Sequence, residues 1–135
     1  MNPSDYWKFL PYGYLFSVAI EAPILMVGLS RRHPWTDRLL AGLWLTACTY
    51  PIVSLAMPLL MLPAYPRWAY LAVGETFAPV AECTLFWLAY GSRAERWKRS
   101  MWQDLAVVVL ANLASFLIGE ASGFGDMIMK YVTAT

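Results

Sequence analysis

Residues 102–119 read WQDLAVVVLANLASFLIG, an almost uninterrupted apolar run. The hydrocarbon core of a bilayer is about 30 Å thick, so a helix needs about 20 mostly apolar residues to cross it. Three more apolar stretches of similar length precede this one, at about residues 12–30, 38–61 and 68–90. Helices are the expected form, because backbone polar groups inside lipid must be hydrogen-bonded within the protein. The sequence therefore predicts an all-α membrane protein with four transmembrane helices.

The composition excludes an ordinary soluble domain. Hydrophobic residues make up 59% of the 135-residue chain and charged residues only 14%, whereas roughly 25% of the residues in a typical soluble domain are charged. A chain of this length forms one domain, so residues 1–135 are expected to make a single membrane domain whose main partner is the lipid bilayer. The net charge of +1 and the lack of a basic face give no indication of nucleic-acid binding.

The connections between the apolar stretches are short and contain residues that end helices. Pro34 lies in the first connection, Pro63 and Pro66 lie in the second, and Gly91 stands where the third stretch ends. Short connections force successive helices to run antiparallel. The predicted fold is therefore a four-helix, up-down transmembrane bundle with both termini on the same side.

Basic residues predict which side that is. Because cytoplasmic connections carry an excess of Lys and Arg, both termini are expected on the outer, non-cytoplasmic side of the cell (inner) membrane. Seven of the ten Lys and Arg residues flank the first and third connections: Arg31, Arg32, Arg38, Arg93, Arg96, Lys98 and Arg99. The first apolar stretch is interrupted by Glu21 and Pro23 and then continues to Leu29, which favours a membrane span over a cleavable signal peptide.

Four glutamates lie inside the predicted spans or at the end of one: Glu21 in the first, Glu75 and Glu82 in the third, and Glu120 at the end of the fourth. A charge at the centre of a bilayer costs about 2.5–3.5 kcal/mol even on the most lenient scale. Glu75 and Glu82 are two helical turns apart and therefore share one helix face, and Asn112 lies near the middle of the last span. We expect these five side chains to form a polar file across the membrane that binds ions or protons.

Two interpretations of these acids stay open at the level of sequence. No Lys or Arg inside the spans is available to pair with them. Carboxyl groups in such a place take up protons, share a proton, or hold a cation. In the other interpretation each protonated Glu is hydrogen-bonded to a neighbouring helix and only stabilises the bundle.

Further polar and helix-distorting residues accompany the acids. Thr49, Tyr50 and Ser115 add polar groups within the spans, and Pro23 and Pro79 lie close to acids along the chain. Proline leaves the carbonyl four residues earlier without its helical partner. Transporters bind cations at broken helices of this kind, whereas in other membrane proteins proline only kinks a helix.

Metal and enzyme motifs are missing from the sequence. The lone His33 is expected at the membrane interface, and Cys48 and Cys83 are expected to be small buried side chains, with their mutual distance left open. Residues 119–125 are glycine-rich and indicate a helix end followed by a loop. The sequence predicts no catalytic residue and no cofactor other than a bound cation, and it leaves the identity of any metal open.

Two segments resemble uncharacterised small bacterial four-span membrane proteins. One contains Glu75 and Glu82 ahead of an aromatic end at residues 86–90, and the other is ANLASFLIG at residues 111–119. The resemblance implies the four-span topology and directs attention to the polar positions, but it implies no activity.

Three hypotheses for the function follow. The first is a protein that binds or conducts a proton or cation through Glu21, Glu75 and Glu82, as a homo-oligomer or within a larger membrane complex. The second is a structural or accessory subunit of a larger membrane complex, with the polar residues as interhelical contacts. The third, an intramembrane enzyme, is the least favoured, because the sequence shows no nucleophile with a matching base.

Overall fold

The computed structural model describes residues 3–94 and 96–134, and these residues form helices and the turns that join them. The elements in chain order are α1 (Pro3–Gly28), α2 (Trp35–Pro51), the π-helical segment η1 (Ile52–Ala56), α3 (Met57–Met61), α4 (Arg67–Tyr90), α5 (Arg99–Ser122) and α6 (Phe124–Ala134). Four continuous helical stretches are long and apolar enough to cross a membrane: Ser4–Gly28, Trp35–Met61, Arg67–Tyr90 and Arg99–Ser122. The prediction of an all-α membrane protein with four spanning helices is confirmed.

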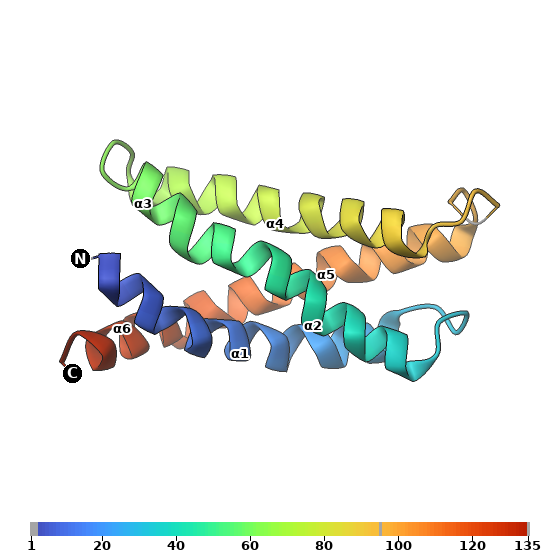
Figure 1. Ribbon diagram of the computed structural model, residues 1–135, viewed down its shortest axis with the longest axis horizontal. Coiled ribbons are helices and arrows are strands. Elements are labelled where there is room, and N and C mark those ends of the chain that lie inside the picture. The colour runs from blue at the N-terminus through green and yellow to red at the C-terminus, as the bar shows by residue number, and fades with distance from the viewer. Residues whose placement is uncertain (1–2, 95, 135) are drawn as a thin grey trace.

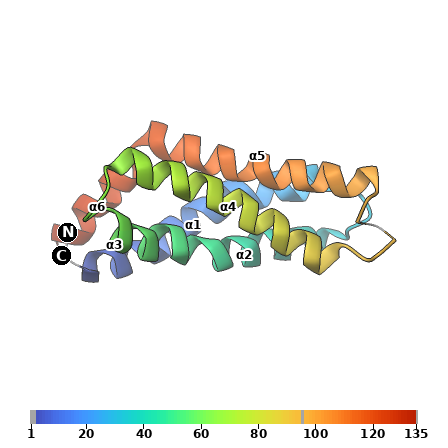
Figure 2. The same ribbon diagram turned by 90° about the horizontal axis from the view of Figure 1, so that it is seen from above.

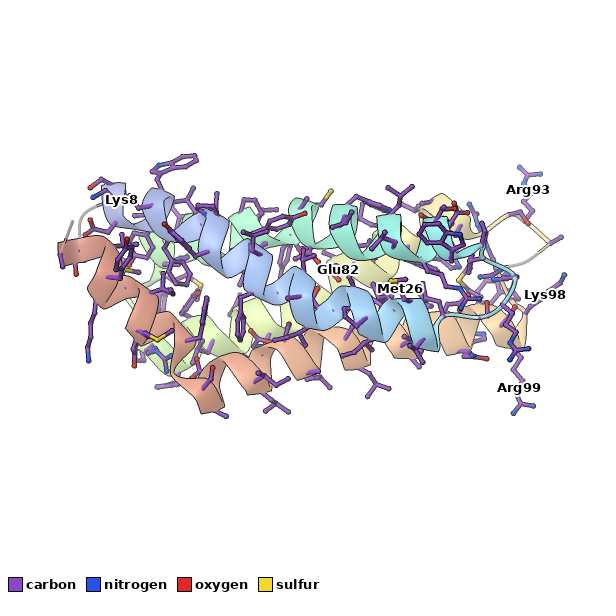
Figure 3. All side chains as sticks on the ribbon, turned by 90° about the horizontal axis from the view of Figure 1, so that it is seen from below. Lys8, Met26, Glu82, Arg93, Lys98 and Arg99 are labelled. Atoms are coloured by element: carbon purple, nitrogen blue, oxygen red, sulfur yellow. The ribbon has the colours of Figure 1, made fainter. Side chains whose placement is uncertain are left out.

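The four long helices lie side by side, and successive ones run in opposite directions (Figures 1 and 2). Both termini lie at one end, which we call the terminal end (Figure 1). The α1–α2 and α4–α5 connections lie at the other, the basic end, where Figure 3 shows Arg93, Lys98 and Arg99. The up-down arrangement is confirmed, whereas the side of the membrane that each end faces stays a prediction.

The outer surface of the bundle is apolar. Large hydrophobic side chains are exposed on each of the spanning helices, including Leu15, Val27, Leu60, Val80 and Leu117. Exposed apolar surface on this scale is costly in water but favourable against lipid tails. The surface therefore agrees with a helical membrane protein.

The first helix is longer than its apolar part. α1 begins at Pro3, although the apolar stretch begins only at about residue 12. Asp5 and Lys8 make the added segment polar, which is why hydropathy alone leaves it out. Pro11 lies inside the helix without ending it.

The C-terminal helix α6 was not predicted. Residues 119–125 were expected to be a helix end and a loop, but a single residue makes the turn: Gly123, at φ 63°, ends α5 in the left-handed conformation. α6 then begins at Phe124, whose ring stacks on that of Phe16 in α1 with 4.0 Å between centroids. The loop prediction was wrong because one left-handed glycine is enough to redirect a helix.

The two halves of the bundle are packed differently. The buried apolar core lies in the half near the basic end and consists of Leu25, Leu29, Ala41, Leu45, Phe86, Met101, Val108 and Ala111. α1 and α2 approach closely there, because a Cβ atom at Gly42 would lie 2.8 Å from the Cα atom of Ala22. The half near the terminal end instead contains a cavity.

Candidate functional site

The cavity has a volume of about 490 Å³ and is lined by all four spanning helices and by α6. At its outer limit lie Arg67 and Glu120, which are both exposed, so the cavity reaches the surface near the terminal end. At its inner limit lie Glu21 and Glu82. Figure 3 shows Glu82 about halfway along the bundle, so the cavity ends near the middle of the molecule.

Glu21 of α1 is 4% exposed and is hydrogen-bonded to two other helices. The Thr46 hydroxyl of α2 lies 2.7 Å from its Oε2 atom, and the Ser115 hydroxyl of α5 lies 2.5 Å from its Oε1 atom. Thr46 faces Glu21 because the close approach of α1 and α2 at Gly42 brings the following turn of α2 against α1. Glu21 therefore joins three helices through its carboxyl group.

Glu82 of α4 is 2% exposed and repeats this arrangement. The Thr49 hydroxyl of α2 lies 2.6 Å from its Oε1 atom, and the Asn112 amide donates to Oε2 at 2.7 Å. Thr46 and Thr49 lie about one turn apart on α2, so this one face serves both acids. Glu21 and Glu82 are also near enough to interact electrostatically.

The hydroxyl partners can accommodate either charge state of the acids. Thr46 and Thr49 also lie near backbone carbonyls, at 2.9 Å from Gly42 O and 3.2 Å from Leu45 O. Each hydroxyl has one proton but two acceptors. When the acid is ionised, the threonine hydroxyl donates its proton to the carboxylate. When the acid is protonated, the acid donates to the threonine hydroxyl, and that hydroxyl then donates to the backbone carbonyl. Ser115 has the same choice through Asn112 O at 3.0 Å.

The remaining two predicted acids have different surroundings. Glu75 is half-buried, lines the cavity, and makes no hydrogen bond or ion pair with another described residue. Glu120 is exposed and forms an ion pair with Arg67 at 2.8 Å. The expectation that no basic residue pairs with these acids was therefore wrong for Glu120, because Arg67 stands at the first turn of α4 and reaches it.

The predicted polar file occupies only half of the bundle. Glu120, Glu75, Glu21, Glu82 and Asn112 all line the one cavity. Beyond the inner acids, the apolar core of the other half includes Leu25, Leu45 and Phe86, each nearly fully buried. The idea of a file across the whole membrane was thus wrong, because a layer of apolar side chains separates the cavity from the basic end.

The predicted supporting residues either line the cavity or lie within unbroken helices. Tyr50 lines the cavity, and its hydroxyl lies where a Cβ atom at Gly13 would collide with it. α1 and α4 continue through Pro23 and Pro79 as unbroken helices. The interpretation of these prolines as helix breaks was therefore wrong. The irregular π-helical segment follows Pro51 instead.

A second polar cluster, around Asp104, was missed by the sequence analysis. Asp104 is 0% exposed and lies near the basic end of α5. It accepts hydrogen bonds from the backbone N–H of Ser30 at 2.6 Å and from Arg32 at 2.8 Å, and the Nε2 atom of His33 lies 3.1 Å away. The cluster fastens the α1–α2 connection to α5. This carboxylate and the rings of Phe86 and Tyr90 enclose His33, so it is buried within the protein at the basic end, and its position at the membrane interface stays a prediction.

Metal ligands and disulfides are not found among residues 3–94 and 96–134. These residues contain no group of three or more His, Cys, Asp or Glu side chains that could hold a metal ion. Cys48 and Cys83 are both free thiols. Cys48 is exposed on the bundle surface, so the expectation that it is buried was wrong, whereas Cys83 is half-buried.

No protein-family model, no curated protein and no solved structure matches this chain. The class that the fold defines is a small helical membrane protein with four spanning helices. Its function must therefore be inferred from the chemistry of the cavity.

Proposed function

We propose that this protein binds a cation in exchange for a proton at Glu21 and Glu82, on the inner wall of the cavity. The observation that carries the proposal is the combination of two buried acids, hydroxyl and amide partners for each of them, and a cavity that leads to them from the surface. Neither acid has a basic partner among the described residues. A positive charge brought to this place by a ligand would therefore be stabilised by an acid that has released its proton.

The exchange follows from the hydrogen bonds. With no ligand, a proton on each acid keeps the site neutral, and the threonine hydroxyls donate to carbonyls of their own helix. When a cation with one positive charge enters, one of the two acids releases its proton through the cavity, and the threonine hydroxyl beside that acid turns towards the carboxylate. All the groups are satisfied in both states, so the change needs only rotation of O–H bonds.

The proposed setting is the cell (inner) membrane, with the terminal end and the cavity on the outer side. The basic half is closed by the apolar core, so transport would require that half to open. Four helices enclose little space beyond this cavity, and we propose that the protein acts as a homo-oligomer or as part of a larger membrane complex.

Infrared spectroscopy tests the proposal directly, because the C=O stretch of a protonated carboxyl group is resolved from that of a carboxylate. In lipid, the wild type is expected to show this band at acidic pH and to lose it at alkaline pH. Glu21→Gln and Glu82→Gln should each reduce the pH-dependent change in the intensity of this band. Asp37→Asn is the control and should not reduce it, because Asp37 lies in the first turn of α2, at the basic end. A band from buried carboxyl groups that persists over the whole pH range of the folded protein would contradict proton exchange.

One observation favours a second function, that of a structural subunit. The hydrogen bonds of Glu21 and Glu82 connect α1, α2, α4 and α5, so they also hold the bundle together. A persistent carboxyl band, together with a stable co-purifying partner that survives both Gln substitutions, would favour this function over cation exchange.

A further inference from the structure

We propose that the cavity takes an organic cation with a single positive charge and an apolar body, such as a substituted ammonium ion. This inference rests on the proposed function, because Glu21 and Glu82 supply the negative charge. It adds the chemical class of the ligand, which the acids alone do not define.

The size of the cavity favours an organic molecule. Its volume of about 490 Å³ falls within the range of about 300–1,000 Å³ that is usual for small-molecule sites. An inorganic cation needs only a shell of oxygen ligands a few ångströms across. The carboxyl oxygens of Glu21 and Glu82 also already face hydroxyl or amide donors, and the described residues offer no cluster of three metal ligands.

The walls of the cavity are rich in aromatic rings. Rings come from every spanning helix and from α6: Tyr6, Phe9, Phe16, Tyr50, Tyr70, Phe116 and Phe124. Aromatic faces attract cations, especially those that are weakly hydrated and have apolar substituents. Such walls suit a substituted ammonium ion better than a hydrated metal ion.

The charges on the lining select the sign of the ligand. Glu21, Glu75 and Glu82 lie along the inner part of the cavity. Arg67, the one basic residue among its described lining residues, stands at the outer limit and is paired with Glu120. An anion would meet these inner acids with no basic partner, so the lining excludes anionic ligands.

Calorimetry with a charged probe and its neutral isostere tests the inference. The full chain in phosphatidylcholine nanodiscs is titrated with benzyltrimethylammonium and, separately, with neopentylbenzene, which has carbon in place of the ammonium nitrogen. We expect saturable binding of the ammonium ion alone. Equal binding of the isostere would overturn the inference and show an unspecific apolar cavity. Binding of neither would overturn the ligand class, and the infrared titration would then show separately whether proton exchange still holds.

Variants separate charge from aromatic contact. Glu82→Gln should weaken binding about tenfold or more, because the ligand loses a charge partner at low dielectric constant, whereas Asp37→Asn should leave it unchanged. Phe116→Leu should weaken binding about two- to thirtyfold, the range expected for one cation–aromatic contact, because Phe116 lines the cavity next to Ser115, which donates to Glu21. Phe77→Leu is the matched control, because Phe77 lies on α4 but does not line the cavity. Unchanged affinity in Glu82→Gln, with normal helix content, would contradict the inference.

Discussion

Thr46 and Thr49 differ from other threonines of the bundle because their hydroxyls face buried carboxyl groups. Valine has nearly the same shape but no hydroxyl, so Thr46→Val or Thr49→Val leaves one carboxyl oxygen without its partner. Each change should lower the free energy of unfolding by about 1–3 kcal/mol, measured by thermal unfolding in detergent. Thr84→Val is the control, because the Thr84 hydroxyl is exposed and bonds only to Val80 O, at 2.8 Å. An equal loss of unfolding free energy in all three variants would show that the contacts with the acids do not stabilise the protein.

Asp104 should matter for stability and not for ligand binding. Asp104→Asn removes the negative charge that pairs with Arg32 in a buried place, a kind of change that costs about 3 kcal/mol or more. Thermal unfolding should show this loss, while the variant that remains folded should bind benzyltrimethylammonium as the wild type does. Asp126→Asn, at an exposed position of the terminal end, should leave the unfolding temperature nearly unchanged. An unaltered unfolding temperature in Asp104→Asn would remove Asp104 from the set of stabilising residues.

The sequence identified the buried acids of the cavity but not their partners. An acid within an apolar run is visible in one dimension, as Glu21 and Glu82 show. That Ser115 faces Glu21 depends on the rotation of α5 about its axis, which short apolar motifs do not determine. Asp104 was overlooked for a related reason: Arg32 was considered only as a marker of orientation and His33 only as an interfacial residue, so no buried partner was sought for them.

At the scale of helices, Gly42 determines how closely α1 and α2 approach. A Cβ atom there would lie 2.8 Å from backbone of Ala22, which cannot move without shifting the helix. Gly42→Ala should therefore separate α1 from α2, lower stability by about 1–3 kcal/mol, and weaken the contact between Glu21 and Thr46. Gly119→Ala is the control, because its Cβ atom would make an ordinary 3.6 Å contact with Phe16. Thermal unfolding of both variants measures the difference; a Gly42→Ala variant as stable as Gly119→Ala would contradict the close approach.

Gly123 and Gly125 form a matched pair for testing the turn into α6. Neither has an atom within 4 Å of an added Cβ, but only Gly123 has a positive φ, of 63°. Gly123→Ala should destabilise the turn by about 1–2 kcal/mol, so that α6 detaches more often from α1. Hydrogen exchange of α6 amides should then become faster, while Gly125→Ala should leave exchange unchanged or slow it. Equal exchange in the two variants would show that the left-handed turn does not hold α6 in place.

The sequence predicted well those helices that correspond to apolar stretches long enough to span a bilayer. The four spanning helices satisfy a simple requirement of bilayer thickness, so their number follows from hydropathy. α6 is too short to span, and its contacts with α1, such as the Phe124–Phe16 stack, are tertiary. The π-helical segment after Pro51 likewise depends on how the second span accommodates two prolines, which composition does not reveal.

For the whole molecule, the division into two halves carries the functional meaning. The terminal half holds the cavity and its acids, and the basic half holds the apolar core and the Asp104 cluster. The cavity therefore leads to Glu21 and Glu82 from the terminal end, and the apolar core lies between them and the basic end. Which compartment supplies the ligand then depends on the orientation of the bundle in the membrane.

Labelling of cysteines in intact cells determines that orientation. In a background with Cys48→Ala and Cys83→Ala, the changes Lys8→Cys and Arg93→Cys place single thiols at opposite ends (Figure 3). Because seven of the ten Lys and Arg residues flank the connections at the basic end, that end should face the cytoplasm. A membrane-impermeant maleimide should then label Lys8→Cys in intact cells and Arg93→Cys only after the cells are opened. The reverse pattern would place the cavity on the cytoplasmic side, and the proposed ligand would then have to come from inside the cell.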